Sequence, residues 1–214
     1  SDVCSSDLRA FDRPFEPPDP VQYTLSEIMP PEATLHWKDR LVAAGGFRVG
    51  LSASQDLEFH LRLACEGLTF CHLPEILYTK RVVAGSVSSN YVKAVAPQLS
   101  FLPEACEALS RRGELSEDRA RAFAAHMARV GRGCMQRGAT DVGLEFFRAA
   151  KAAHPGGGLP AAYTPPARLM YRIFGPVLTE RLVQWKRGAT SSNSRSGIAA
   201  AASAAAPPNK ESHA

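Results

Sequence analysis

Asp56 is the residue of this sequence best placed for acid–base chemistry. It follows Gln55 at the start of an amphipathic run that carries Arg62 further along. A carboxylate within about 2.6–3.2 Å of a hydroxyl group can take its proton while that oxygen attacks an electrophile. Asp56 is therefore a candidate general base, Gln55 a neighbour that could orient substrate, and Arg62 a candidate phosphate contact.

Asp56 and Arg62 also have interpretations without chemistry. An aspartate in the first turn of a helix interacts favourably with the helix dipole, which is worth about 0.3–1 kcal/mol. Arg62 can form an ion pair with Asp56, Glu58 or Glu66 instead of contacting a phosphate. The residues alone leave both interpretations open.

A helix and two glycines are expected to position these side chains. Ser52 or Ser54 can cap the helix, Leu57 and Leu61 recur at helical spacing, and Gly67 ends it. A short helix over 37–44 is expected to end at Gly45 and Gly46, because glycine allows a left-handed cap and a close backbone approach. Short strands are expected over 33–36, 69–73 and 76–83, where apolar, β-branched or aromatic residues alternate or cluster. The proline-rich stretch 9–31 predicts a loop with one helical turn near 23–28.

The order of motifs from Ala33 to Ser88 resembles the second half of the catalytic domain of family 2 glycosyltransferases, which have the GT-A fold. The matching motifs are Gly45-Gly46-Phe47, Gln55-Asp56, the sequence LRLA at 61–64, Leu77-Tyr78, Arg81, and Ser86 with Ser88. The sequence departs from the family at two positions. Arg48 follows Phe47 where an acidic residue is usual, and Val83 stands where many members have a histidine.

The resemblance implies the inverting transfer of a sugar from a nucleotide-diphosphate sugar to the hydroxyl group of a glycan or lipid-linked acceptor. It implies that Asp56 is the general base. It places substrate contacts at Gly45, Gly46, Phe47, Gln55, Arg62 and Arg81. It also implies a divalent cation, Mg²⁺ or Mn²⁺, for the intact enzyme, with ligands mostly in sequence that precedes this chain. We therefore expect a cytoplasmic enzyme of cell-envelope polysaccharide synthesis, of which this chain alone is an inactive fragment.

The fold expected from this resemblance is α/β. Residues 9–91 would form the C-terminal half of a GT-A, or nucleotide-diphospho-sugar transferase, domain. Residues 92–155 are expected to form a helical extension, because their apolar residues recur at helical spacing. Within it, the helices expected over 117–137 and 139–153 resemble a single tetratricopeptide hairpin, with Gly131 and Gly143 allowing close approach and Phe147 filling the gap.

The C-terminal part divides into a linker, a basic helix and a tail. Residues 156–166 are rich in glycine and proline. Residues 167–187 mix arginines with large apolar residues and could lie on the inner face of the plasma membrane; docking on the protein itself is the alternative. Residues 188–214 are low in complexity, and we expect a disordered tail.

Composition excludes several classes of protein. The net charge of +4 is mild, so we expect no nucleic-acid partner. The sequence has no apolar run long enough to span a membrane. Its five cysteines include no CxxC pair, which argues against a zinc ribbon. Residues 1–8, SDVCSSDL, match the translation of a common sequencing adapter, so we expect them to be an artefact.

A non-catalytic interpretation stays open beside the enzymatic one. The helices after Val92 could belong to an interaction protein or a membrane-surface adapter. That hypothesis requires no missing sequence, but it leaves the motifs from Gly45 to Ser88 unexplained.

Overall fold

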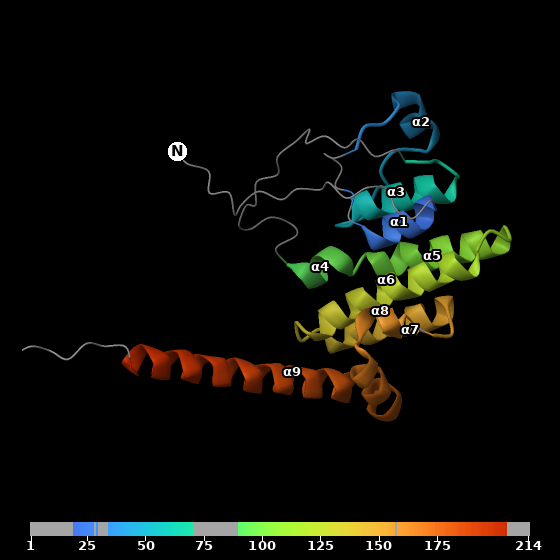
Figure 1. The fold of residues 1–214 in the computed structure, drawn as a ribbon. Coiled ribbons are helices and arrows are strands. Elements are labelled where there is room, and N and C mark those ends of the chain that lie inside the picture. The colour runs from blue at the N-terminus through green and yellow to red at the C-terminus, as the bar shows by residue number, and fades with distance from the viewer. Residues whose placement is uncertain (1–18, 28, 30–33, 71–89, 157, 205–214) are drawn as a thin grey trace, which may run out of the picture. The chain divides into compact units, whose positions relative to one another are not determined.

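The computed structural model describes residues 19–27, 29, 34–70, 90–156 and 158–204 (Figure 1). The chain divides into two compact units, residues 1–164 and residues 165–214. The first unit contains α1 (Pro20–Ser26), α2 (Lys38–Ala43), α3 (Gln55–Cys65), α4 (Tyr91–Val95), α5 (Gln98–Arg111), α6 (Glu117–Met135), α7 (Thr140–Ala153) and α8 (Leu159–Ala162). The second unit contains α9 (Pro165–Ala204).

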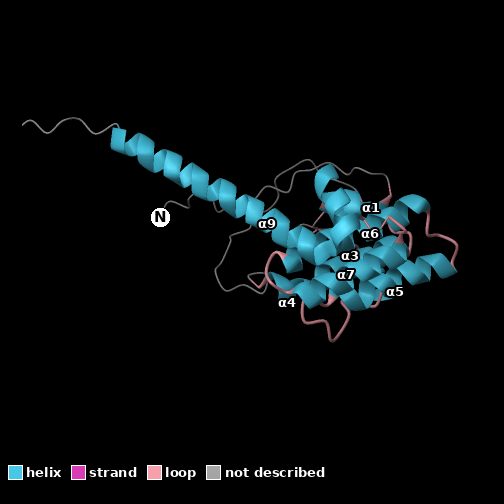
Figure 2. Cartoon of the chain, turned by 90° about the horizontal axis from the view of Figure 1, so that it is seen from below, coloured by secondary structure: helices cyan, strands magenta, loops and turns pink. Residues whose placement is uncertain are grey.

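The α/β prediction is wrong for the described residues, which form helices and loops and contain no strand (Figure 2). Residues 34–36 and 69–70 carry no regular structure. The remainder of the expected strands, at 33, 71–73 and 76–83, lies outside the described residues. Side-chain preferences identified extended stretches, but an extended stretch becomes a strand only when a neighbour completes its backbone hydrogen bonds.

The helices begin and end near the expected residues. Ser116 caps α6 by accepting a hydrogen bond from the Arg119 N–H at 3.2 Å. Pro97 lies between α4 and α5, directly before the first residue of α5. Gly67 and Gly138, which follow α3 and α6, have the positive φ angles of helix ends. Local signals therefore suffice to place these helices.

The core of the first unit is built around α6. This helix contacts α1, α7 and α8, while α3 contacts α1 and α5 (Figure 1). The largest fully buried side chains come from several helices, and include Leu25, Phe59, Leu61, Leu102, Phe123, Met127 and Phe146. The helices after residue 92 thus share one core with the segment that carries Asp56.

Where α6 crosses α7, the backbones of the two helices lie close together. A Cβ atom on Gly131 would lie 2.9 Å from the carbonyl oxygen of Gly143, and one on Gly143 would lie 2.7 Å from that of Gly131. Phe147 is buried beside this crossing and stacks on Tyr163 with ring centroids 6.1 Å apart. The two glycines therefore set the distance between these helices.

α9 is two helical stretches joined at Gly175, whose φ of 72° and ψ of 176° are not helical. Pro176 follows directly, so the interruption falls at the residue before the proline. α9 continues through residues 188–204 to Ala204. The disordered tail expected over 188–214 stays a prediction. This stretch includes an alanine run, and alanine has the highest helix propensity.

The predicted artefact at residues 1–8 lies outside the described residues. Among the helices that the structure describes, none has both the length and the apolar character needed to cross a membrane.

Candidate functional site

The residue that begins α3 has an unusual backbone. Ser54 has a φ of 59°, and no other residue except glycine has a positive φ in the described part of the chain. The left-handed conformation costs a residue with a side chain about 1–2 kcal/mol. The Ser54 hydroxyl does not cap α3; it donates to the carbonyl oxygen of Ala94 at 2.8 Å and accepts from the Gln98 amide at 3.0 Å. Side chains and backbone of α4 and α5 therefore hold this strained turn.

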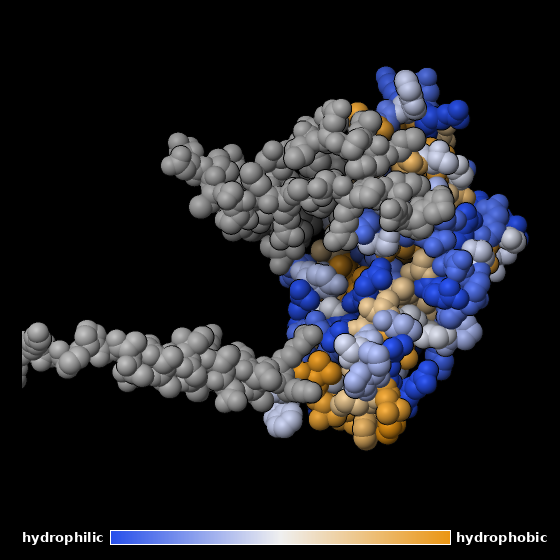
Figure 3. Space-filling model, in the orientation of Figure 1, coloured by the Kyte–Doolittle hydropathy of each residue, from blue (hydrophilic) through white to orange (hydrophobic). Residues whose placement is uncertain are grey.

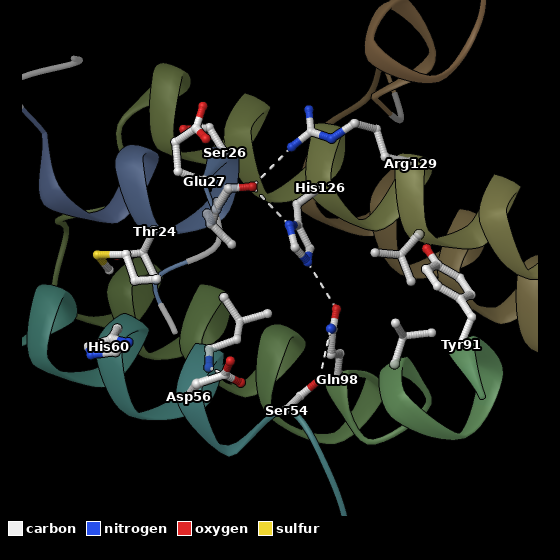
Figure 4. Close-up of a pocket in the computed structure, with 15 residues that line it drawn as sticks. Thr24, Ser26, Glu27, Ser54, Asp56, His60, Tyr91, Gln98, His126 and Arg129 are labelled. Carbon is white, nitrogen blue, oxygen red and sulfur yellow. Dashed lines mark hydrogen bonds between the residues drawn. The ribbon is translucent and has the colours of Figure 1, made fainter. Parts of the chain in front are cut away.

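The turn at Ser54 borders a cavity of about 360 Å³ (Figure 4). Five helices and the segments beside them contribute to its wall. The lining residues are Thr24, Leu25, Ser26, Glu27, Met29, Ser54, Asp56, Leu57, His60, Tyr91, Val95, Gln98, His126, Arg129 and Val130. The cavity is therefore built jointly by the segment carrying the candidate base and by the helices after residue 90.

Asp56 lies in the first turn of α3, half-buried at the wall of this cavity. Its Oδ1 accepts a hydrogen bond from the backbone N–H of Leu57 at 2.9 Å. No cation forms an ion pair with Asp56 within the described ranges. Among the described residues, the Leu57 N–H is therefore the group that orients the carboxylate.

His126, on α6, lines the cavity and contacts both α1 and α5. Its Nδ1 lies 2.8 Å from the carbonyl oxygen of Leu25, and its Nε2 lies 2.9 Å from Oε1 of Gln98 (Figure 4). Arg129 donates to the same Leu25 carbonyl at 3.0 Å. Burial lowers the pKa of His126 to about 4, so the ring is neutral near pH 7 and its single N–H donates to only one of these two oxygens. Through Gln98, this histidine is connected to the Ser54 turn.

Arg62 stabilises the glycine turn and does not reach the cavity. Its guanidinium group donates to the carbonyl oxygens of Ala44 and Gly46 and to Glu58, where Nε lies 2.9 Å from Oε1. The ion-pair interpretation of Arg62 is therefore the one that the geometry supports. Phe47 packs on Phe59 with ring centroids 4.7 Å apart, so this ring contact holds the turn against α3 in addition to the Arg62 hydrogen bonds.

The structure brings only part of the expected site together. Of the candidate site residues, Asp56 lines the cavity, while Gly45, Gly46, Phe47, Gln55 and Arg62 are not among its lining residues. Gln55 donates to the carbonyl oxygen of Leu51 at 2.9 Å, which stabilises the turn before α3. Arg81 lies outside the described residues.

Sequence reasoning missed the polar residues that α5 and α6 supply. Gln98 is buried and His126 is half-buried, and His126 stands in the apolar stripe formed by Phe123, Met127 and Val130. A polar residue inside such a stripe requires a hydrogen-bond partner. The position of His126 in this stripe is the signal that the sequence offers, but it does not point to Asp56 while residues 92–155 are expected to form a separate extension.

Two more histidines lie on the other side of Asp56. His60 is buried, and its Nε2 lies 3.4 Å from Nε2 of His36 and 3.3 Å from the Thr34 hydroxyl. Burial, followed by the neighbouring His36, lowers the pKa of His60 to about 4. No cluster of three or more His, Cys, Asp or Glu side chains suited to a metal ion occurs within the described residues. These residues therefore assign no ligand to the expected Mg²⁺ or Mn²⁺.

Comparison of the chain with models of protein families, with curated proteins and with solved structures finds no match.

Proposed function

We propose that this protein transfers a sugar from a nucleotide-diphosphate sugar to an acceptor hydroxyl group, with Asp56 as the general base. The observation that carries the proposal is the position of Asp56, whose carboxylate lines a cavity and has no ion-pair partner within the described residues. The order of motifs from Gly45 to Ser88 supplies the reaction class. The proposal concerns this site and requires no sheet among the described residues.

The cavity has the size and lining of a small-molecule site. Ligand pockets measure about 300–1,000 Å³ and combine apolar walls with a few polar groups. Here Leu25, Leu57 and Val95 supply apolar wall, while Glu27 and Arg129 lie with Asp56 among the charged lining residues. A sugar ring has both apolar faces and hydroxyl groups, so this lining suits an acceptor glycan.

In the reaction, the acceptor hydroxyl oxygen attacks the anomeric carbon of the donor from the face opposite the diphosphate. The new carbon–oxygen bond forms as the bond to the diphosphate breaks, and the nucleoside diphosphate leaves with that electron pair. Asp56 takes the hydroxyl proton, which becomes acidic as attack proceeds. A divalent cation, when bound, would neutralise charge on the diphosphate; no step here is assigned to residues that hold it.

The test compares Asp56→Asn with Asp118→Asn in the intact protein. Asp118 occupies the corresponding position of α6 and lies exposed beside Arg121. The assay follows transfer of radiolabelled sugar from UDP-, GDP- and dTDP-sugars to glycan and lipid-linked acceptors. Loss of a general base lowers the rate about 10²–10⁴-fold. We expect that loss for Asp56→Asn and no change for Asp118→Asn.

Equal rates in Asp56→Asn and the unmodified protein, or transfer of no sugar by the intact protein, would contradict the proposal.

A further inference from the structure

Large apolar side chains are exposed on both helical stretches of α9 over residues 165–185. Leu169, Ile173, Phe174, Leu178, Leu182 and Trp185 are all exposed, with Ile173 at 63% and Trp185 at 74%. Leu178, Leu182 and Trp185 are spaced four and three residues apart, so they share one face of the helix. Figure 3 shows the orange patch that this part of α9 presents.

The polarity of this segment is reversed relative to an ordinary surface helix. Thr179 and Glu180 are buried, at 0% and 3% exposure, while Leu178 and Leu182 beside them face outward. A helix in water normally buries its apolar stripe and exposes its polar residues. The exposed face that carries Leu178, Leu182 and Trp185 therefore fits a surrounding that is less polar than water.

The charges on the same segment have one sign. Arg172 and Arg181 are exposed, and Lys186 and Arg187 follow directly in sequence. Glu180 is the one acidic residue in the stretch 167–187, and it is buried. Exposed charge next to the apolar stripe is therefore cationic, which is complementary to phosphate headgroups and not to a second copy of the same face.

We propose that residues 165–187 bind the surface of a membrane that contains anionic lipids, with the apolar side chains in the acyl boundary and the cations at the headgroups. Trp and Leu facing lipid beside Arg and Lys at the phosphates are characteristic of helices that lie in the interface. The inference goes beyond sugar transfer and does not depend on it.

The experiment uses Trp185 as the reporter in the full chain. The chain has two tryptophans, Trp37 and Trp185, so Trp37→Phe leaves Trp185 alone. Vesicles of phosphatidylcholine, with or without phosphatidylglycerol, are added to this variant. With the anionic vesicles we expect a blue shift of emission, protection from iodide and quenching by brominated acyl chains, because the indole enters the acyl boundary.

Matched substitutions distinguish binding through this face from nonspecific binding of the protein to vesicles. Leu182→Ser should weaken binding, while Val49→Ser, at an exposed apolar residue outside α9, should leave it unchanged. Arg181→Glu should lower the partition coefficient by more than about fivefold, since each cation near an anionic surface contributes about that factor. Arg111→Glu, at an exposed arginine of α5, should have no such effect.

Each other outcome counts against the proposal. Equal binding to vesicles with and without phosphatidylglycerol would overturn the electrostatic part. A Trp185 emission that no vesicle changes, or self-association of the chain that Leu182→Ser abolishes, would show that the face does not bind lipid. Transfer activity is not used as a readout, so failure here and failure of the sugar-transfer proposal are distinguishable.

Discussion

Two helices of this protein begin with the same local pattern and put it to different uses. Ser54 and Asp56 open α3, and Ser116 and Asp118 open α6, with one residue between serine and aspartate in each case. Ser116 caps its helix, whereas the Ser54 hydroxyl contacts Ala94 and Gln98 from other helices.

The aspartates differ in the same way. Asp118 is exposed and pairs with Arg121 at 2.7 Å, whereas Asp56 lines a cavity. The comparison shows that two helix starts with the same local pattern differ because tertiary contacts take the capping hydroxyl of one of them. The following predictions test that difference between the two helix starts.

The largest expected effect is a loss of folding stability at acidic pH, and it comes from His126. Its folded-state pKa of about 4 lies below the usual value of 6.5, so the unfolded chain binds a proton that the folded chain excludes. Stability is therefore full above pH 6.5, falls between pH 6.5 and 4, and levels off below. Because one pKa unit corresponds to 1.36 kcal/mol, this histidine accounts for a loss of about 3 kcal/mol.

Urea unfolding at several pH values, compared with His126→Gln, checks this expectation. In His126→Gln, the free energy of unfolding should fall by about 3 kcal/mol less between pH 6.5 and 4 than in the unmodified protein. Part of the fall should remain, because His60 also has a lowered pKa and contributes in the same direction. Parallel curves for the two proteins would show that His126 is not excluded from water.

The next largest effect is expected at Gln98, which links His126 to Ser54. Gln98→Leu leaves the Ser54 hydroxyl and the His126 ring without this partner, and we expect a total cost of about 1–3 kcal/mol. The matched control is Gln136→Leu, at the exposed C-terminal cap of α6, which should change stability by less than about 0.5 kcal/mol. Urea unfolding of both variants at pH 7 makes the measurement, and equal effects would show that the Ser54 turn does not depend on Gln98.

The smallest expected effect comes from replacing each of the two serines with aspartate, which tests their different roles directly. Aspartate caps a helix about as well as serine, so Ser116→Asp should change the free energy of unfolding by less than about 0.5 kcal/mol. Ser54→Asp removes the hydrogen that bonds the Ala94 carbonyl and should cost about 1–2 kcal/mol. A difference between the two variants near zero would mean that the starts of α3 and α6 are equivalent after all.

The sequence was sufficient for most helix boundaries in the described residues, because caps, prolines and glycines act locally. Ser116, Pro97 and Gly138 each mark a boundary close to the one observed. The fold class was not predictable in the same way, because it depends on which segments pair across the chain. Extended stretches near 34–36 and 69–70 were identified as strands from propensity, and the structure shows none there.

The candidate site was predictable at one residue and not at its surroundings. Asp56 could be singled out because motif order and position in a helix are visible in sequence. Its neighbours His126 and Arg129 are about seventy residues away along the chain, and only packing of α6 against α1 brings them to the cavity. Arg62 was assigned to substrate on the motif alone, whereas its contacts hold the glycine turn.

The glycine crossing of α6 and α7 also bears on how this protein can diverge. At Gly131 and Gly143 any added carbon meets backbone or the Met135 side chain, and at Gly158 it would come within 2.0 Å of the Ala124 carbonyl oxygen. Gly45 and Gly46 have open space around them, and only their backbone angles restrict them. In descendants of a common ancestor, surface charges and loop lengths can drift while these crossing positions stay small. They are the positions by which a distant relative of this chain would still be recognised.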